Sequence, residues 1–117
     1  MNNVVIYHNP RCSKSRQTLA LLQERGIVPE QVLYLETPPA PAEIRRLLKR
    51  LNMSARELLR KGEAEFTALN LSDSALSENQ LIDAMSEHPR LIERPIVVVG
   101  DRAVIGRPPE RVLELIS

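Results

Sequence analysis

The sequence predicts an α/β protein in which a mixed four-stranded β-sheet carries an inserted helical segment. Three observations predict this class. Short β-branched runs occur near both ends of the 117-residue chain, a helical pattern follows the first run, and only helical patterns fill the middle. An apolar fraction of 43% is sufficient for one packed core. We therefore expect residues 1–117 to form a single domain.

The first part of the chain is predicted to run strand, helix, strand. Val4–Tyr7 is a β-branched apolar run that the turn residues His8-Asn9-Pro10 end. A helix should begin near Ser13 and end at Gly26, because glycine is common just past a helix terminus. Gln31–Leu35 is the second predicted strand. Two strands joined through a helix should be parallel, with a right-handed crossover.

The middle of the chain is predicted to be helical. The proline-rich segment 36–41 ends the second strand. Three helical patterns follow it, and they cover Ala42–Leu51, Ala55–Lys61 and Ser77–Glu87. Ser54 and Glu57 form a capping box for the second of these helices. Phe66–Leu71 is ambiguous, and His88-Pro89 should stop the third helix.

The end of the chain returns to β-structure. Pro95–Val99 is the strongest predicted strand, and Gly100-Asp101 should turn it into a returning strand over Arg102–Ile105. A closing helix is predicted over Pro109–Ile116. A mixed four-stranded sheet with helices on its faces, interrupted by inserted helices, is the thioredoxin-like arrangement.

Composition excludes several function classes. A formal net charge of +1 and an aromatic content of 3% do not favour nucleic-acid or membrane binding. No apolar run approaches the roughly 20 residues of a membrane span, and the N-terminus lacks the basic region of a signal peptide. One cysteine and two distant histidines do not form a metal site. A single cysteine also fits a reducing compartment, so we expect the cytoplasm.

The loop after the first strand contains the candidate chemistry. Cys12 lies between a strand and a helix, where free backbone N–H groups and the helix dipole favour a thiolate. Arg11, Lys14 and Arg16 make the loop basic, and His8 is near enough for its ring to approach the sulfur. The same N–H groups can also bind a tetrahedral oxyanion.

Simpler interpretations of this loop stay open. A lone cysteine is most often a small buried hydrophobic residue, a histidine before Asn-Pro is often a turn residue, and basic residues commonly solvate a helix start. The polar, basic surroundings of Cys12 favour a reactive thiol. Ser15 stands where a dithiol oxidoreductase has its second cysteine. The chain must therefore use an external thiol to resolve a mixed disulfide, which points to glutathione and glutaredoxin.

The sequence resembles the glutaredoxin-coupled arsenate reductases over nearly its whole length, and most closely their short, chromosomal-type members. The motifs that carry the resemblance are Tyr7-His8-Asn9-Pro10-x-Cys12-x-x-Ser15-Arg16-x-Thr18-Leu19, Tyr34-Leu35-Glu36-Thr37-Pro38-Pro39, Arg56-x-Leu58-Leu59-Arg60-Lys61, Leu81-Ile82-Asp83, His88-Pro89-x-Leu91-Ile92-x-Arg94-Pro95-Ile96-Val97-Val98 and Gly106-Arg107-Pro108-Pro109.

The resemblance implies a role for each matched residue. It implies that Cys12 is the nucleophile, that His8 helps to lower its pKa, and that three arginines bind the arsenic oxyanion, namely Arg60, Arg94 and Arg107. Ser15 would donate a hydrogen bond to the sulfur or to the oxyanion. Arsenate would be reduced to arsenite with glutathione as co-substrate and glutaredoxin as partner, with no bound cofactor.

Two other functions remain alternatives. One is a glutathione-dependent thiol reductase or deglutathionylase that uses Cys12 without arsenic. The other is a redox regulator that binds RNA polymerase, although such regulators usually carry a second cysteine at the position of Ser15. Without the resemblance, Arg60 would be interpreted as an ordinary exposed helix charge.

We further expect Cys12 to be partly exposed and to have a depressed pKa. We also expect the Arg94–Pro95 peptide bond to be cis and to face Cys12, with the Arg94 side chain in the same pocket.

Overall fold

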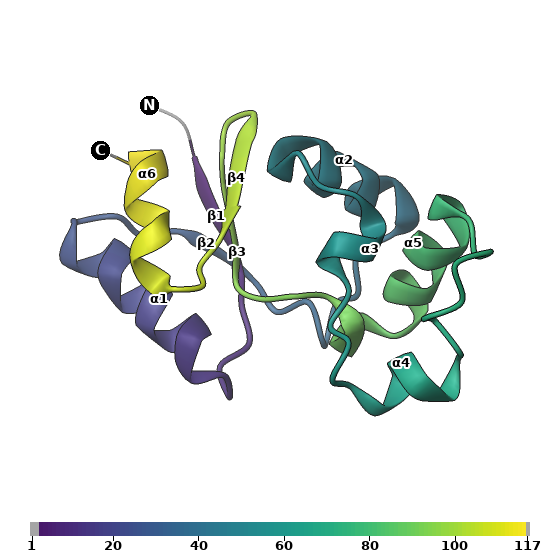
Figure 1. The fold of residues 1–117 in the computed structure, drawn as a ribbon. Coiled ribbons are helices and arrows are strands. Elements are labelled where there is room, and N and C mark those ends of the chain that lie inside the picture. The colour runs from purple at the N-terminus through teal and green to yellow at the C-terminus, as the bar shows by residue number, and fades with distance from the viewer. Residues whose placement is uncertain (1–2, 117) are drawn as a thin grey trace. The chain divides into compact units, whose positions relative to one another are not determined.

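The computed structural model describes residues 3–116, and these fall into two compact units (Figure 1). The first contains residues 3–37 and 94–116 and holds the β-sheet, and the second contains residues 38–93 and is helical. Each unit is described by itself below. That the chain forms a single domain stays a prediction.

The first unit contains the mixed four-stranded sheet that the sequence predicts. Its strands are β1 (Val4–Tyr7), β2 (Glu30–Val32), β3 (Ile96–Val99) and β4 (Arg102–Ile105), in the order β2-β1-β3-β4. β1 pairs with β2 in parallel, whereas β3 is antiparallel to both of its neighbours, β1 and β4. The parallel first pair and the final hairpin are therefore both confirmed.

β2 differs from the predicted strand Gln31–Leu35. It begins one residue earlier and ends at Val32. The reason is local: the carbonyl of Leu33 accepts hydrogen bonds from the amides of Glu36 and Thr37, at 2.9 Å each. The backbone therefore turns at Leu33, and its polar groups are used within the turn rather than in the sheet.

α1 (Ser13–Glu24) begins and ends where the sequence predicts. Gly26 has a φ of 75°, a left-handed conformation that glycine adopts without steric cost. The predicted closing helix is instead two short segments, the 3₁₀-helix η2 (Pro109–Val112) followed by α6 (Leu113–Ile116). α1 and α6 lie on the same side of the sheet (Figure 1).

The core of the sheet unit lies between the sheet and these helices. Four fully buried side chains form it, one each from β1, α1, β3 and η2: Ile6, Leu22, Val97 and Val112. These four residues come from both ends of the chain. Closing the core therefore requires the segment before residue 38 and the segment after residue 93 together.

The regular elements of the second unit, residues 38–93, are all helices. It contains α2 (Pro41–Leu51), α3 (Ala55–Leu58), α4 (Ala64–Ala68), α5 (Glu78–Glu87) and the 3₁₀-helix η1 (Pro89–Leu91). α5 packs against α2, α3 and η1. The predicted capping box at Ser54 is present, and Ser77 forms a second one with Gln80. In the ambiguous stretch Phe66–Leu71, residues 66–68 belong to α4 and residues 69–71 form a turn.

α3 is shorter than the predicted helix Ala55–Lys61. The chain turns extended at Leu59, which forms an antiparallel bridge with Ile92. The amide of Arg60 donates to the carbonyl of Leu91 at 2.7 Å, and the amide of Glu93 donates to the carbonyl of Leu58 at 3.0 Å. Pairing with this distant segment therefore replaces the last turn of the predicted helix.

Over residues 3–116, no helix has the length and apolar character needed to cross a membrane.

Candidate active site

Cys12 stands at the N-terminus of α1, immediately before its first residue. Its amide donates to the carbonyl of Asn9 at 3.0 Å, and its own carbonyl accepts the first helical hydrogen bond, from the amide of Arg16. Only 8% of the residue is exposed. The expectation of partial exposure is therefore wrong, because the tight Asn9–Cys12 turn folds the residue into the unit rather than leaving it on an open loop.

The surroundings of Cys12 lower the pKa of its thiol. Burial by itself raises that pKa, but the backbone amides of Ser15 and Lys14 and the positive charges of Arg94 and Arg107 outweigh it. The two amides belong to the first turn of α1, whose N–H groups have no helical acceptor. The predicted depressed pKa is confirmed, and it arises from backbone donors together with two guanidinium groups.

Arg107 is the cation for which the structure gives a direct contact with the sulfur. Its Nη2 lies 3.7 Å from Cys12 Sγ, and its Nε donates to the carbonyl of Arg94 at 2.8 Å. The Arg94–Pro95 peptide bond is cis, as predicted, and the Arg107–Pro108 bond is also cis. The structure thus brings Arg94 and Arg107 together at Cys12. Whether they bind an oxyanion stays a prediction.

His8 and Ser15 form a buried pair beneath the cysteine loop. The Nδ1 atom of His8 lies 2.6 Å from Ser15 Oγ, and the amide of Asn9 donates to the same hydroxyl at 3.0 Å. Burial first, and then the charge of Arg16, lower the pKa of His8. A neutral imidazole therefore holds the Ser15 side chain, while the Ser15 amide acts on Cys12.

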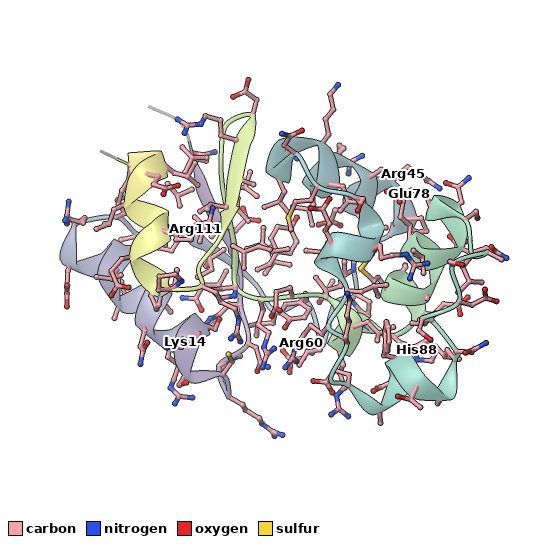
Figure 2. All side chains as sticks on the ribbon, viewed as in Figure 1. Lys14, Arg45, Arg60, Glu78, His88 and Arg111 are labelled. Carbon is pink, nitrogen blue, oxygen red and sulfur yellow. The ribbon has the colours of Figure 1, made fainter. Side chains whose placement is uncertain are left out.

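Arg60 belongs to the helical unit. Arg60, which is labelled in Figure 2, follows α3, and its guanidinium forms ion pairs with Glu63 at 2.5 Å and with Glu93 at 3.7 Å. Both acidic partners belong to the same helical unit. The assignment of Arg60 to the oxyanion site stays a prediction.

The sequence interpretation missed two residues that support the site, Thr18 and Gly106. A Cβ atom on Gly106 would lie 2.5 Å from Thr18 Oγ1 and 3.0 Å from Pro95 Cγ. Thr18 is fully buried, and its hydroxyl donates to the carbonyl of Lys14 at 2.8 Å. A glycine is therefore required where the backbone approaches α1, directly before Arg107. The glycine of the Gly-Arg-Pro-Pro motif is the sequence feature that could have indicated this close approach.

Lys14 contributes differently from the sequence expectation. The sequence predicts that its side chain is one of the loop cations, and Figure 2 shows the residue at the start of α1. The structure places the backbone amide of Lys14, rather than its ammonium, among the groups that lower the pKa of Cys12.

Within residues 3–116, no three His, Cys, Asp or Glu side chains gather into a group that could hold a metal ion.

A family model described as the ArsC family matches residues 7–115, almost the entire chain. The chain belongs to the ArsC family. The arsenate reductase of Haemophilus influenzae is 49% identical over 97% of this chain and 99% of its own length. The Escherichia coli (strain K12) protein named Uncharacterized protein YfgD is 62% identical, with 97% of both chains covered.

Solved structures of ArsC relatives share the fold. The arsenate reductase from Vibrio cholerae superimposes with a TM-score of 0.95 at 54% identity, covering 97% of each chain. The thioredoxin-like α/β fold predicted from the sequence is therefore confirmed. ArsC membership also supports an oxidoreductase built around the single cysteine.

Proposed function

We propose that this protein reduces arsenate to arsenite, with glutathione and glutaredoxin as the reducing thiols and Cys12 as the nucleophile. The observation that carries the proposal is the guanidinium of Arg107 beside Cys12 Sγ. A cation at this position both stabilises the thiolate and attracts the dianion that the thiolate must attack. Sequence relatives named arsenate reductase support the choice of substrate.

The groups around Cys12 suit a tetrahedral oxyanion. Arsenate carries negative oxygens like phosphate, and arginine offers planar, permanently charged, paired donors to such groups. Arg94 and Arg107 supply two of these guanidiniums, and the amides of Ser15 and Lys14 supply backbone donors. Arg60 is the third arginine that we propose as an oxyanion ligand.

The proposed reaction begins at sulfur. The Cys12 thiolate attacks arsenic, a sulfur–arsenic bond forms, and one arsenate oxygen leaves as water after taking protons. The glutathione thiol then forms a second sulfur–arsenic bond and displaces a second oxygen as water. Arsenic remains As(V) through both of these steps.

Glutaredoxin completes the reduction in the proposed scheme. Its thiolate attacks the glutathione sulfur, so that a glutaredoxin–glutathione disulfide forms and the electron pair of the broken bond goes to arsenic. This step converts As(V) to As(III). Water then breaks the bond between Cys12 and arsenic, releases arsenite and restores the thiol. Ser15 cannot act as a resolving thiol, which is why both reductants come from outside.

The test is a coupled assay with NADPH, glutathione reductase, glutathione, glutaredoxin and arsenate. We expect NADPH oxidation that depends on arsenate and is abolished in Cys12→Ser, because a serine hydroxyl does not ionise at neutral pH. Ser15→Ala should do much less harm. Reduction of glutathione mixed disulfides without any arsenate-dependent oxidation would instead establish the thiol-reductase alternative.

A further inference from the structure

A cavity of about 310 Å³ lies beside the cysteine loop, within the sheet unit. Its lining comes from two segments only: His8, Asn9, Pro10 and Arg11 after β1, and Leu33, Leu35 and Glu36 after β2. These segments follow the carboxyl ends of two neighbouring parallel strands. In α/β proteins this is the edge of the sheet where ligands commonly bind. Its volume is at the small end of the range of small-molecule sites, about 300–1,000 Å³.

One wall of the cavity is formed by residues 8–11, the segment that leads directly into Cys12. Arg11 precedes Cys12, and the Asn9 carbonyl that accepts the Cys12 amide belongs to the same turn. His8 lines the cavity and contacts Ser15, whose amide acts on Cys12. A ligand in the cavity is therefore held by the same loop that holds the sulfur.

The cavity offers one positive group, one negative group and an apolar wall. Arg11 and Glu36 are exposed, and within residues 3–116 neither side chain forms an ion pair or a hydrogen bond. Leu35 is 39% exposed, one of the three large apolar side chains described as exposed. Such a site fits a small zwitterionic peptide that presents a carboxylate at one end and an ammonium at the other.

We propose that this cavity binds glutathione, the co-substrate in the proposed function, with Arg11 on a carboxylate and Glu36 on the γ-glutamyl ammonium. Bound there, glutathione presents its thiol to the Cys12 loop for the second step of the reaction. In that step the thiol sulfur bonds to arsenic, and an arsenic oxygen leaves as water with the thiol proton. The role of glutathione in this reaction step rests on the proposed function, whereas the binding of glutathione to the cavity does not.

Because Arg11 and Glu36 carry opposite charges, enzyme kinetics can test the proposal. We expect Arg11→Gln and Glu36→Gln each to raise the KM for glutathione by about fivefold, the factor for one partly exposed ion pair. The KM for arsenate should change much less. Arg102→Gln and Glu24→Gln remove exposed charges elsewhere on the sheet unit and should leave both constants within about twofold.

A change of KM in opposite directions would overturn the proposal. Removing a cation and removing an anion change the electrostatic potential at Cys12 in opposite directions. Both changes, however, weaken the binding of a zwitterion that contacts the two side chains. A changed KM for glutaredoxin, with an unchanged KM for glutathione, would assign the cavity to the protein partner instead and would likewise overturn it.

A binding measurement separates this proposal from the arsenate reaction. S-Methylglutathione, which cannot react through sulfur, is titrated into the ¹⁵N-labelled protein and followed by NMR. We expect shifts at the amides of Asn9, Arg11, Leu35 and Glu36, reduced in Glu36→Gln. These shifts support the site even if arsenate is not reduced. Their absence, or shifts confined to the β4–η2 loop, overturns the site even in an active arsenate reductase.

Discussion

At Cys12, acidity is supplied by groups that lie far apart in the sequence. The amides of Ser15 and Lys14 come from the adjacent helix turn, whereas Arg94 and Arg107 come from the other end of the chain. The first contribution is predictable from the strand–cysteine–helix order alone. The two arginines could be assigned to the site only through the family resemblance, since no local pattern connects them to the cysteine.

Arg107→Gln should raise the pKa of Cys12, because it removes the guanidinium that lies 3.7 Å from the sulfur. The measurement is the rate of iodoacetamide alkylation against pH. We expect wild type to titrate below the value of a free cysteine, about 8.5. Arg102→Gln, on β4, serves as the matched control. A wild-type titration at or above the free value would contradict the site described here.

His8 makes stability depend on pH in a predictable direction. Its pKa is lowered in the folded protein, so below about pH 6.5 the unfolded chain binds the extra proton first. The free energy of unfolding therefore falls as the pH drops from about 6.5 toward the folded pKa, and this contribution is constant below it. Urea unfolding of wild type, compared with His8→Gln, should show that loss only in wild type.

His88→Gln is the control for that experiment, since it removes the chain's other histidine and keeps His8. An unfolding free energy whose pH dependence is the same in wild type and His8→Gln would show that His8 takes up its proton equally in both states. It would also remove the basis for a neutral imidazole on Ser15.

Among the elements, the β4–η2 connection leaves no room for a side chain at Gly106. Gly106→Ala places a Cβ against Thr18 Oγ1 and Pro95 Cγ, and neither neighbour is the end of a long side chain. We expect a loss of about 1–3 kcal/mol in the free energy of unfolding, as for other overpacked sites. Displacing the following residue, Arg107, should also raise the pKa of Cys12.

A double-mutant comparison isolates this contact. In a Thr18→Ala background, the cost of Gly106→Ala should be smaller, because Thr18 Oγ1 and Cγ2 are two of the three atoms nearest the added carbon. Gly62→Ala is the matched control, since nothing lies within 4 Å of its added Cβ. Equal costs in both backgrounds would contradict the proposed clash.

The elements whose limits were predicted correctly are those with strong local signals. The β-branched run of β1, the glycine after α1 and the capping box before α3 are all readable within a few residues. The end of α3 was predicted wrongly, because Leu59 leaves the helix to pair with Ile92. Such an ending depends on a segment that no short window contains.

For the whole molecule, the sheet unit depends on a small core. Leu22 is fully buried against Ile6, Val97 and Val112, so Leu22→Ala should lower the free energy of unfolding by about 2–5 kcal/mol. Val28→Ala is the control, because Val28 is 93% exposed, and it should stay within about 0.5 kcal/mol of wild type. Chemical denaturation monitored by circular dichroism measures both. Equal losses of unfolding free energy in Leu22→Ala and Val28→Ala would show that Leu22 does not belong to the core of the sheet unit.

The strand order has a consequence for how the protein is made. β1 is synthesised among the first residues, yet its antiparallel partner β3 is synthesised near the end. While the ribosome adds the intervening helices, the nascent cysteine has neither Arg94 nor Arg107 beside it, because these residues do not yet exist. The nascent thiol therefore lacks the two guanidinium groups that help to lower its pKa in the folded protein. The full set of groups that lower this pKa is present only after residues 94–107 have been synthesised and have folded against the start of α1.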